Sequence, residues 1–136
     1  MDISTNSCLA VGFSKEFLDR LPLGADTEPR KAEYELLLIG ESGEFHGKLE
    51  RAETVVCPRR VTLDRPFPCS MAVTCGMTED CTVSFSSISE NSALLSLSRP
   101  FSGRRPCDVR VKLRQGVSVY ENLVLQAVRI LEARDD

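Results

Sequence analysis

Short apolar segments, separated by clusters of turn-forming residues, run through most of the chain. Each segment is rich in Val, Ile, Leu, Thr or aromatic residues, and the stretches between them contain Gly, Pro, Asn, Asp or Ser. The expected strands cover residues 34–39, 45–56, 60–63, 70–74, 81–87, 93–98, 108–114 and 123–131. Many short strands at this spacing are typical of sandwiches and barrels. The sequence therefore predicts a single mainly β domain over residues 1–136, an antiparallel β-sandwich or barrel with one short N-terminal helix.

The predicted helix lies near residues 13–18. Ser14 stands where an N-cap side chain accepts a backbone hydrogen bond, and Phe13 and Leu18 have the spacing of a hydrophobic staple. Pro22 ends the run, because proline cannot continue a helix. The helix is therefore expected to be two turns long.

Alternation along the strands predicts which residues form the core. Two triplets have the clearest period of two, and they are expected to face the interior. These residues are Ala93, Leu95, Leu97, Val109, Val111 and Leu113. The run at residues 123–131 is apolar on both phases, which favours a central strand. A terminal helix is the alternative, because Leu, Gln, Ala and Arg also propagate helices.

The cysteine content indicates an oxidising compartment. The six cysteines are Cys8, Cys57, Cys69, Cys75, Cys81 and Cys107. An even number at this density favours a secreted protein with disulfides of undetermined pairing. Zinc is the alternative, but structural sites use thiolates two to four residues apart, whereas Cys69 and Cys75 are separated by five residues. A catalytic thiol is not expected, because the only histidine, His46, is predicted to be a surface residue near a turn.

No part of the sequence predicts a membrane span or a reaction centre. The longest apolar runs, such as residues 36–39, are too short to cross a bilayer. Asp2 stands where a secretory signal carries basic residues, so either the protein is cytoplasmic or a signal was removed and Met1 was added. Neither a phosphate-binding loop nor a nucleophile elbow occurs. A non-enzymatic protein without a cofactor or a metal is therefore expected.

Charge is unevenly distributed along the chain. Residues 1–53 contain eleven acids and six bases, whereas residues 99–136 contain eight bases and five acids. The basic part could meet phosphates, sulfates or an acidic protein surface, although Arg110 and Lys112 alternate with apolar residues as on a solvated strand face. Only two aromatic residues, Phe101 and Tyr120, lie in or near this part of the chain. Because nucleic acid bases stack on aromatic side chains, nucleic acid binding is not expected. A protein partner is the predicted ligand.

Residues 83–131 contain an aromatic residue on one strand, alternating apolar residues on the next, then Arg-Pro and a glycine, and a final strand followed by a short turn. These residues are Phe85, Ala93, Leu95, Leu97, Arg99, Pro100, Gly103, Arg104, Asp108, Val109 and the run 112–116. The stretch resembles the C-terminal module of the fibulins, a family of extracellular matrix glycoproteins. The resemblance implies a secreted module that assembles with other proteins. Its expected contacts are Phe101, Arg104 and Arg105, because arginine and aromatic side chains contribute most interface energy. Alternatively, Arg99, Pro100 and Gly103 merely form a turn between two strands.

A second resemblance indicates a different class of function. Arg59, Arg60 and Arg65, followed by the turn at residues 87–93, are similar to the bacterial PilZ domain, a small β-barrel that binds cyclic di-GMP. The resemblance implies phosphate contacts from these three arginines. Arginine suits this role because its planar guanidinium binds phosphate oxygens in pairs. Serine replaces two residues of the family's turn, which weakens the expected binding.

Overall fold

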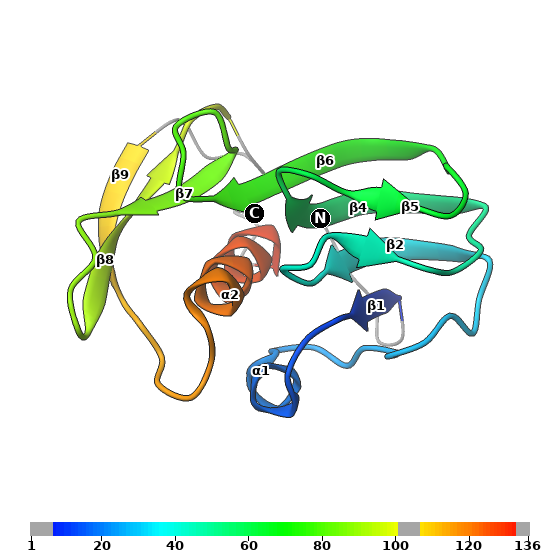
Figure 1. Cartoon of the computed structure of the whole chain (residues 1–136), viewed down its shortest axis with the longest axis horizontal. Helices are drawn as coiled ribbons and strands as arrows, with labels where there is room; N and C mark the ends of the chain where they lie inside the picture. The colour runs from blue at the N-terminus through cyan, green and yellow to red at the C-terminus, as the bar shows by residue number, and fades with distance from the viewer. Residues whose placement is uncertain (1–6, 101–106, 133–136) are drawn as a thin grey trace.

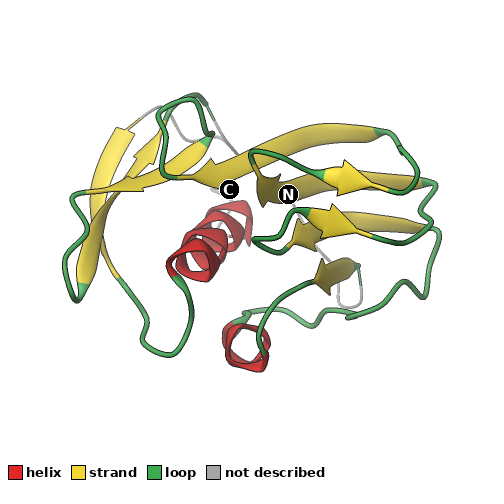
Figure 2. Cartoon of the chain, in the orientation of Figure 1, coloured by secondary structure: helices red, strands yellow, loops and turns green. Residues whose placement is uncertain are grey.

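The computed structural model describes residues 7–100 and 107–132, and strands dominate it (Figure 1). One seven-stranded sheet has the strand order β1-β2-β4-β6-β7-β8-β9. These strands are β1 (Cys8–Val11), β2 (Glu33–Ile39), β4 (Arg51–Pro58), β6 (Cys69–Gly76), β7 (Val83–Ser86), β8 (Ser92–Leu97) and β9 (Cys107–Lys112). A small second sheet pairs β3 (Glu44–Phe45) with β5 (Thr62–Leu63). Figure 2 shows the two helices, α1 (Lys15–Arg20) and α2 (Val119–Glu132), beside these strands. The predicted mainly β fold is confirmed.

Strand direction divides the large sheet into two parts. Strands β1, β2, β4, β6 and β7 run parallel, whereas β8 is antiparallel to both β7 and β9. The arrangement thus differs from the predicted antiparallel sandwich or barrel, because β4 pairs with β2 in parallel. The chain connects β2 to the parallel strand β4 through a crossover that contains β3. A second crossover, which contains β5, connects β4 to the parallel strand β6. Parallel neighbours require such crossovers.

Both faces of the parallel part are covered, by two different layers. Leu36 and Leu38 of β2 belong to the core that includes α2, whereas Leu37 and Ile39 belong to a second core with Phe45 of β3. In Figure 1, α2 lies between the parallel strands and the strands β8 and β9. Burial on both faces explains why β2 is a continuous apolar run rather than an alternating one.

The segment at residues 123–131 is helical, so the predicted final strand is wrong. It belongs to α2, in which ten of the residues Val119–Glu132 are buried. A capping box starts this helix: the Glu121 N–H donates to Ser118 Oγ at 3.0 Å, and the Ser118 N–H donates to Glu121 Oε1 at 3.1 Å. Because the helix is buried nearly all round, its apolar residues occupy both phases and resemble a central strand.

The predicted core triplets differ in burial. Ala93, Leu95 and Leu97 of β8 are buried, as predicted. Val109 of β9 is 47% exposed, so its predicted core position is wrong. Val111 and Leu113 are only partly buried. The reason is that β9 is the last strand of the described sheet, and alternation alone does not reveal an edge.

The predicted N-terminal helix is confirmed together with its cap. The Phe17 N–H donates to Ser14 Oγ at 3.1 Å, and α1 begins at Lys15, directly after Ser14. The ring of Phe13 stacks on that of Phe17 with centroids 4.1 Å apart. This stacking fixes the entry of the chain into the helix.

All six cysteines are free thiols, so the structure does not contain the predicted disulfides. Cys8, Cys57, Cys75 and Cys81 are buried, and the other two are exposed. Although β4 and β6 are neighbours, Cys57 lies in the core under β3 and β5, whereas Cys75 lies in the core around α2. The sheet itself separates these two sulfur atoms.

Candidate functional site

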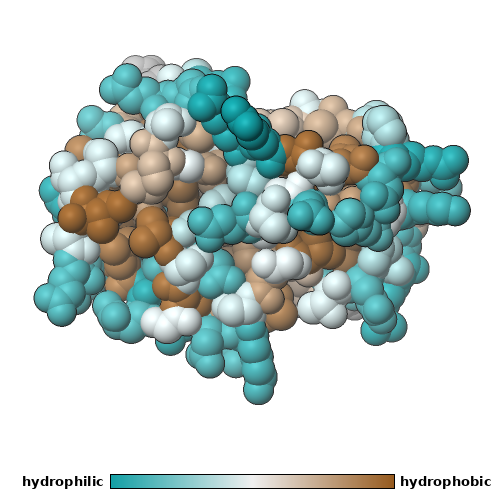
Figure 3. All heavy atoms as spheres, viewed as in Figure 1, coloured by the Kyte–Doolittle hydropathy of each residue, from teal (hydrophilic) through white to brown (hydrophobic). Residues whose placement is uncertain are grey.

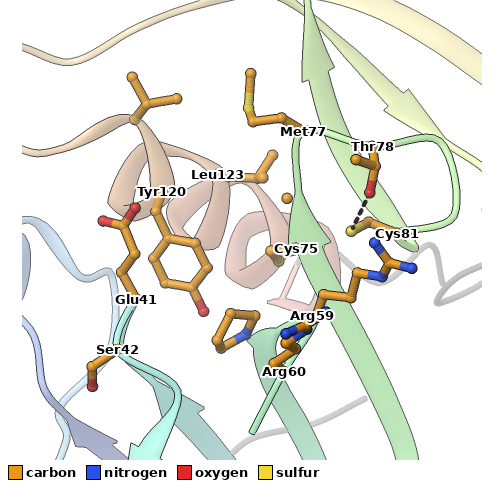
Figure 4. A pocket seen from close by; sticks show the side chains of 13 residues that line it. Glu41, Ser42, Arg59, Arg60, Cys75, Met77, Thr78, Cys81, Tyr120 and Leu123 are labelled. Atoms are coloured by element: carbon orange, nitrogen blue, oxygen red, sulfur yellow. Dashed lines mark hydrogen bonds between the residues drawn. The ribbon is translucent and has the colours of Figure 1, made fainter.

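A cavity of about 440 Å³ lies where the parallel strands end. Residues that directly follow β2, β4 and β6 line it, together with the first turn of α2. Figure 4 shows Glu41 and Tyr120 on one side of this cavity and Arg59 and Cys81 on the opposite side. In open parallel sheets, ligands bind at the carboxyl ends of the strands. The position of the cavity therefore makes it the candidate functional site.

Two adjacent arginines contribute to the rim of the cavity. Nη2 of Arg59 lies 2.9 Å from Oδ2 of Asp80, and both side chains are more than half exposed. Hydrogen bonding by Thr78 and the charge of Arg59 lower the pKa of Asp80, which keeps this carboxylate ionised. Within residues 7–100 and 107–132, no acid forms an ion pair with Arg60. Arg60 thus supplies a positive charge that the described protein does not neutralise.

The inner wall of the cavity is mainly apolar. Cys75, Leu123 and Tyr120 are all buried, while Met77 at the mouth is 52% exposed. The Tyr120 hydroxyl donates to the carbonyl oxygen of Ile39 at 2.7 Å, which fastens the start of α2 to the end of β2. Burial raises the pKa of Tyr120, so its hydroxyl stays protonated. A ligand therefore meets an apolar wall below a charged rim.

Neither the thiol of Cys75 in this wall nor that of Cys57 on the opposite face of the sheet is activated. Burial raises the pKa of Cys75 well above that of an ordinary thiol, and it raises the pKa of Cys57 to about 11. A nucleophilic cysteine needs a lowered pKa, because the thiolate is the reactive form. These thiols remain protonated at neutral pH.

A close approach between two turns places the arginine segment. Gly43 has a φ of +74°, and a Cβ atom there would lie 2.2 Å from the carbonyl oxygen of Arg60. The Gly43 carbonyl also accepts the Thr62 N–H at 2.7 Å. Only glycine tolerates both this φ and this contact. Gly43 thus holds the segment after β4 against the segment after β2.

Glu121 fixes the start of α2 at the cavity. One carboxylate oxygen accepts the Ser14 N–H at 2.8 Å, and the other accepts the Ser14 hydroxyl at 3.1 Å and the Ser118 N–H at 3.1 Å. Glu121 is only 8% exposed, so these donors replace its lost hydration. The same carboxylate therefore joins the N-termini of α1 and α2.

The structure brings together some of the predicted binding residues. Arg59 and Arg60 both line the cavity, whereas the exposed Arg65 does not. The predicted interface residues Phe101, Arg104 and Arg105 lie outside the described residues. Sequence analysis did not predict Glu41 or Tyr120 as cavity residues. The sequence signal that could have identified Glu41 is its position directly after Gly40, the residue that follows the buried run at residues 34–39.

The predicted surface position of His46 is confirmed. Its Nε2 lies 2.9 Å from Glu44 Oε1, and its Nδ1 lies 2.9 Å from Asp64 Oδ1. The carboxylates of Glu44 and Asp64 accept hydrogen bonds from the ring, and they raise the pKa of His46. Within the described parts of the chain, these groups and the other His, Cys, Asp and Glu side chains form no cluster that could hold a metal ion.

No described helix combines the length and apolar character needed to cross a membrane. No protein-family model matches the chain, and neither a curated protein nor a solved structure matches it at a significant level.

Proposed function

We propose that the protein is a non-enzymatic binding module for a small nucleotide-like organic anion. The observation that carries this proposal is the arginine pair Arg59 and Arg60 beside an apolar cavity of about 440 Å³ at the carboxyl ends of three parallel strands. Binding pockets for small molecules are mainly apolar and have a few convergent polar groups. The cavity has this composition.

The charges around the cavity define the ligand further. Arg60 offers an unpaired guanidinium, and Arg59 can share its charge between Asp80 and a ligand. Glu41, from the opposite side, offers a carboxylate to a hydrogen-bond donor (Figure 4). A phosphate on the arginines, a flat ring against Tyr120 and Leu123, and a ring N–H donating to Glu41 would use all three features.

Binding is favoured over catalysis by the state of the side chains. The thiol of Cys75 and the hydroxyl of Tyr120 are both held in the protonated form by burial. His46, the only histidine in the sequence, is not among the residues that line the cavity. Neither the thiol of Cys75 nor the hydroxyl of Tyr120 can therefore act as a general base near neutral pH. The predicted binding of cyclic di-GMP is one form of this proposal.

Isothermal titration with GMP, AMP and cyclic di-GMP tests the proposal. At least one of these ligands should bind, and Arg60→Ala should weaken that binding by about tenfold or more, because a charged hydrogen bond contributes about 1.5–3 kcal/mol. Arg65→Ala is the matched control, since it removes the same charge away from the cavity and should leave the affinity unchanged. Glu41→Gln should weaken a guanine ligand more than an adenine ligand.

Two results would contradict the proposal. Failure of all three nucleotides to bind would exclude the ligand class. Equal losses of affinity in Arg60→Ala and Arg65→Ala would show that the cavity arginine is not distinguished from an arginine away from the cavity.

A further inference from the structure

Strand β9 ends the described sheet and leaves its outer backbone groups unpaired by strand neighbours. The Leu113 N–H donates to the Asn91 carbonyl at 2.8 Å, which continues the antiparallel register of β8 and β9. N–H and C=O groups alternate in direction along a strand. The odd-numbered residues of β9 therefore bond to β8, and the even-numbered residues Asp108, Arg110 and Lys112 direct their backbone groups outward.

An apolar groove runs beside this edge. Val109 and Val111 of β9, Leu95 and Leu97 of β8, and Ile130 of α2 line a cavity of about 200 Å³. Val109 is 47% exposed, which is unusual for a valine on the face of a strand that covers a helix. Figure 3 shows apolar side chains at the surface over the end of the sheet formed by β8 and β9. This face offers apolar contact to a further strand.

The rim of the groove is basic. A second cavity of about 500 Å³ is lined by Arg110, Lys112 and Arg114 from β9 and the residues after it, and by Arg129 of α2. None of its lining residues in the described chain is acidic. Nη1 of Arg110 donates to the Ser87 carbonyl at 3.1 Å. Because this carbonyl is neutral, it does not compensate the positive charge of Arg110.

We propose that β9 binds an extended acidic segment of a partner protein by β-strand addition. The backbone of the segment would bond to the outward groups of Asp108, Arg110 and Lys112. Its side chains would alternate: apolar ones beside Val109 and Val111, and acidic ones opposite Arg110 and Lys112. This site is separate from the nucleotide cavity and does not depend on it.

Two other partners use fewer of these features. A second copy of the chain would bring two basic rims together, and like charges across an interface are unfavourable. A polyanion such as heparin or a nucleic acid would use the basic rim, but it would leave the outward N–H groups and the exposed Val109 without matching partners. An extended peptide with alternating acidic and apolar residues matches the outward backbone groups, the exposed Val109 and the basic rim.

Fluorescence anisotropy with a labelled peptide of alternating Glu and Val tests the proposal. The matched control peptide has the same composition, with all Glu in one half and all Val in the other. The alternating peptide should bind at least about tenfold more tightly, because only it presents one kind of side chain to each face. Equal binding of the two peptides, or stronger binding of a heparin oligosaccharide than of the alternating peptide, would overturn the proposal.

Variants of β9 test the two contributions separately. Arg110→Pro removes an outward N–H and no backbone bond to β8, although the exposed side-chain bonds of Arg110 to Ser87 and Ser92 are also lost. It should abolish peptide binding with little loss of melting temperature. The double variant Arg110→Glu, Lys112→Glu should lose the Glu–Val peptide and bind a Lys–Val peptide instead. Retained Glu–Val binding in this double variant would overturn the proposal. So would a concentration-dependent dimer, seen by analytical ultracentrifugation, that Arg110→Pro dissolves.

Discussion

The parallel and antiparallel parts of the sheet are stabilised differently. Around β2 and β4, both faces are covered, one by α2 and the other by β3 and β5. At β8, the residues that face α2 are buried while Leu94 and Ser96 on the opposite face are only partly covered, and at β9 nearly every side chain is exposed. The covered part carries the cavity at its strand ends, and the uncovered part carries the open edge.

This difference relates stability to function in the two regions. A strand covered on both faces has no free surface except at its ends, so a ligand can be bound only where the strands stop. A strand at an edge keeps half of its backbone groups free, so it can bind another chain along its whole length. The two proposed sites follow from this contrast.

The largest expected effect comes from truncating leucines on opposite faces of one strand. Leu37→Ala and Leu38→Ala of β2 should each lower the free energy of unfolding by about 2–5 kcal/mol, because both side chains are fully buried. In β8, Leu95→Ala should cost a similar amount, whereas the half-buried Leu94→Ala should cost about 1 kcal/mol. Urea denaturation measures the free energy of unfolding of all four variants. Equal costs at Leu94 and Leu95 would mean that the far face of β8 is also covered.

A smaller loss is expected at the junction between the helices. Glu121→Ala leaves the N–H groups of Ser14 and Ser118 without their acceptor, and it should lower the stability by about 2 kcal/mol. Glu121→Gln keeps one acceptor oxygen and should lose less. Circular dichroism melting curves compare the two variants, and an Ala variant as stable as the Gln variant would contradict a capping role.

The edge strand should tolerate a polar substitution that the covered sheet does not. Val109→Ser should change the stability by no more than about 0.5 kcal/mol, since this side chain is already 47% exposed. Val83→Ser, at a fully buried position in β7, is the matched control and should cost about 2 kcal/mol. A large loss at Val109 would show that this face is covered, which would also remove the proposed docking groove.

The smallest effect concerns the layer that covers the parallel part. The pKa of His46 is raised above its usual value of 6.5 by Glu44 and Asp64, so protonated His46 links β3 to the residue after β5. Its contribution is fully present below pH 6.5 and is lost as the pH rises through the raised value. His46→Gln should therefore show a weaker pH dependence of the melting temperature between pH 6 and pH 8. If the melting temperatures of the unchanged protein and of His46→Gln had the same pH dependence, this link between β3 and Asp64 would be contradicted.

Much of the strand content was predictable because it depends on local patterns. The predicted segments at residues 34–39, 70–74 and 93–98 overlap β2, β6 and β8, and Ser14 caps the predicted helix. Strand direction was not predictable, since a period of two is the same for parallel and antiparallel pairing. The continuous apolar run in β2 was the available signal for a parallel sheet covered on both faces.

The candidate site was predicted only in part. The adjacent pair Arg59 and Arg60 was visible as a phosphate-binding pattern, but nothing local distinguished it from Arg65. The cavity also needs Glu41 and Tyr120, which are far from the arginines in the sequence. Secretion and the fibulin-like interface at Phe101, Arg104 and Arg105 stay predictions.

The sequence by itself determined the short strands, the capped N-terminal helix and the basic character of the C-terminal third, because each depends on neighbouring residues. Only the tertiary structure decided that residues 123–131 form a helix, that β9 is an edge of the described sheet, and that Cys57 and Cys75 lie on separate faces of the sheet. These outcomes depend on what covers each surface. Burial on all sides makes a helix and a central strand look alike in sequence, and exposure at an edge leaves the alternation of a buried strand unchanged.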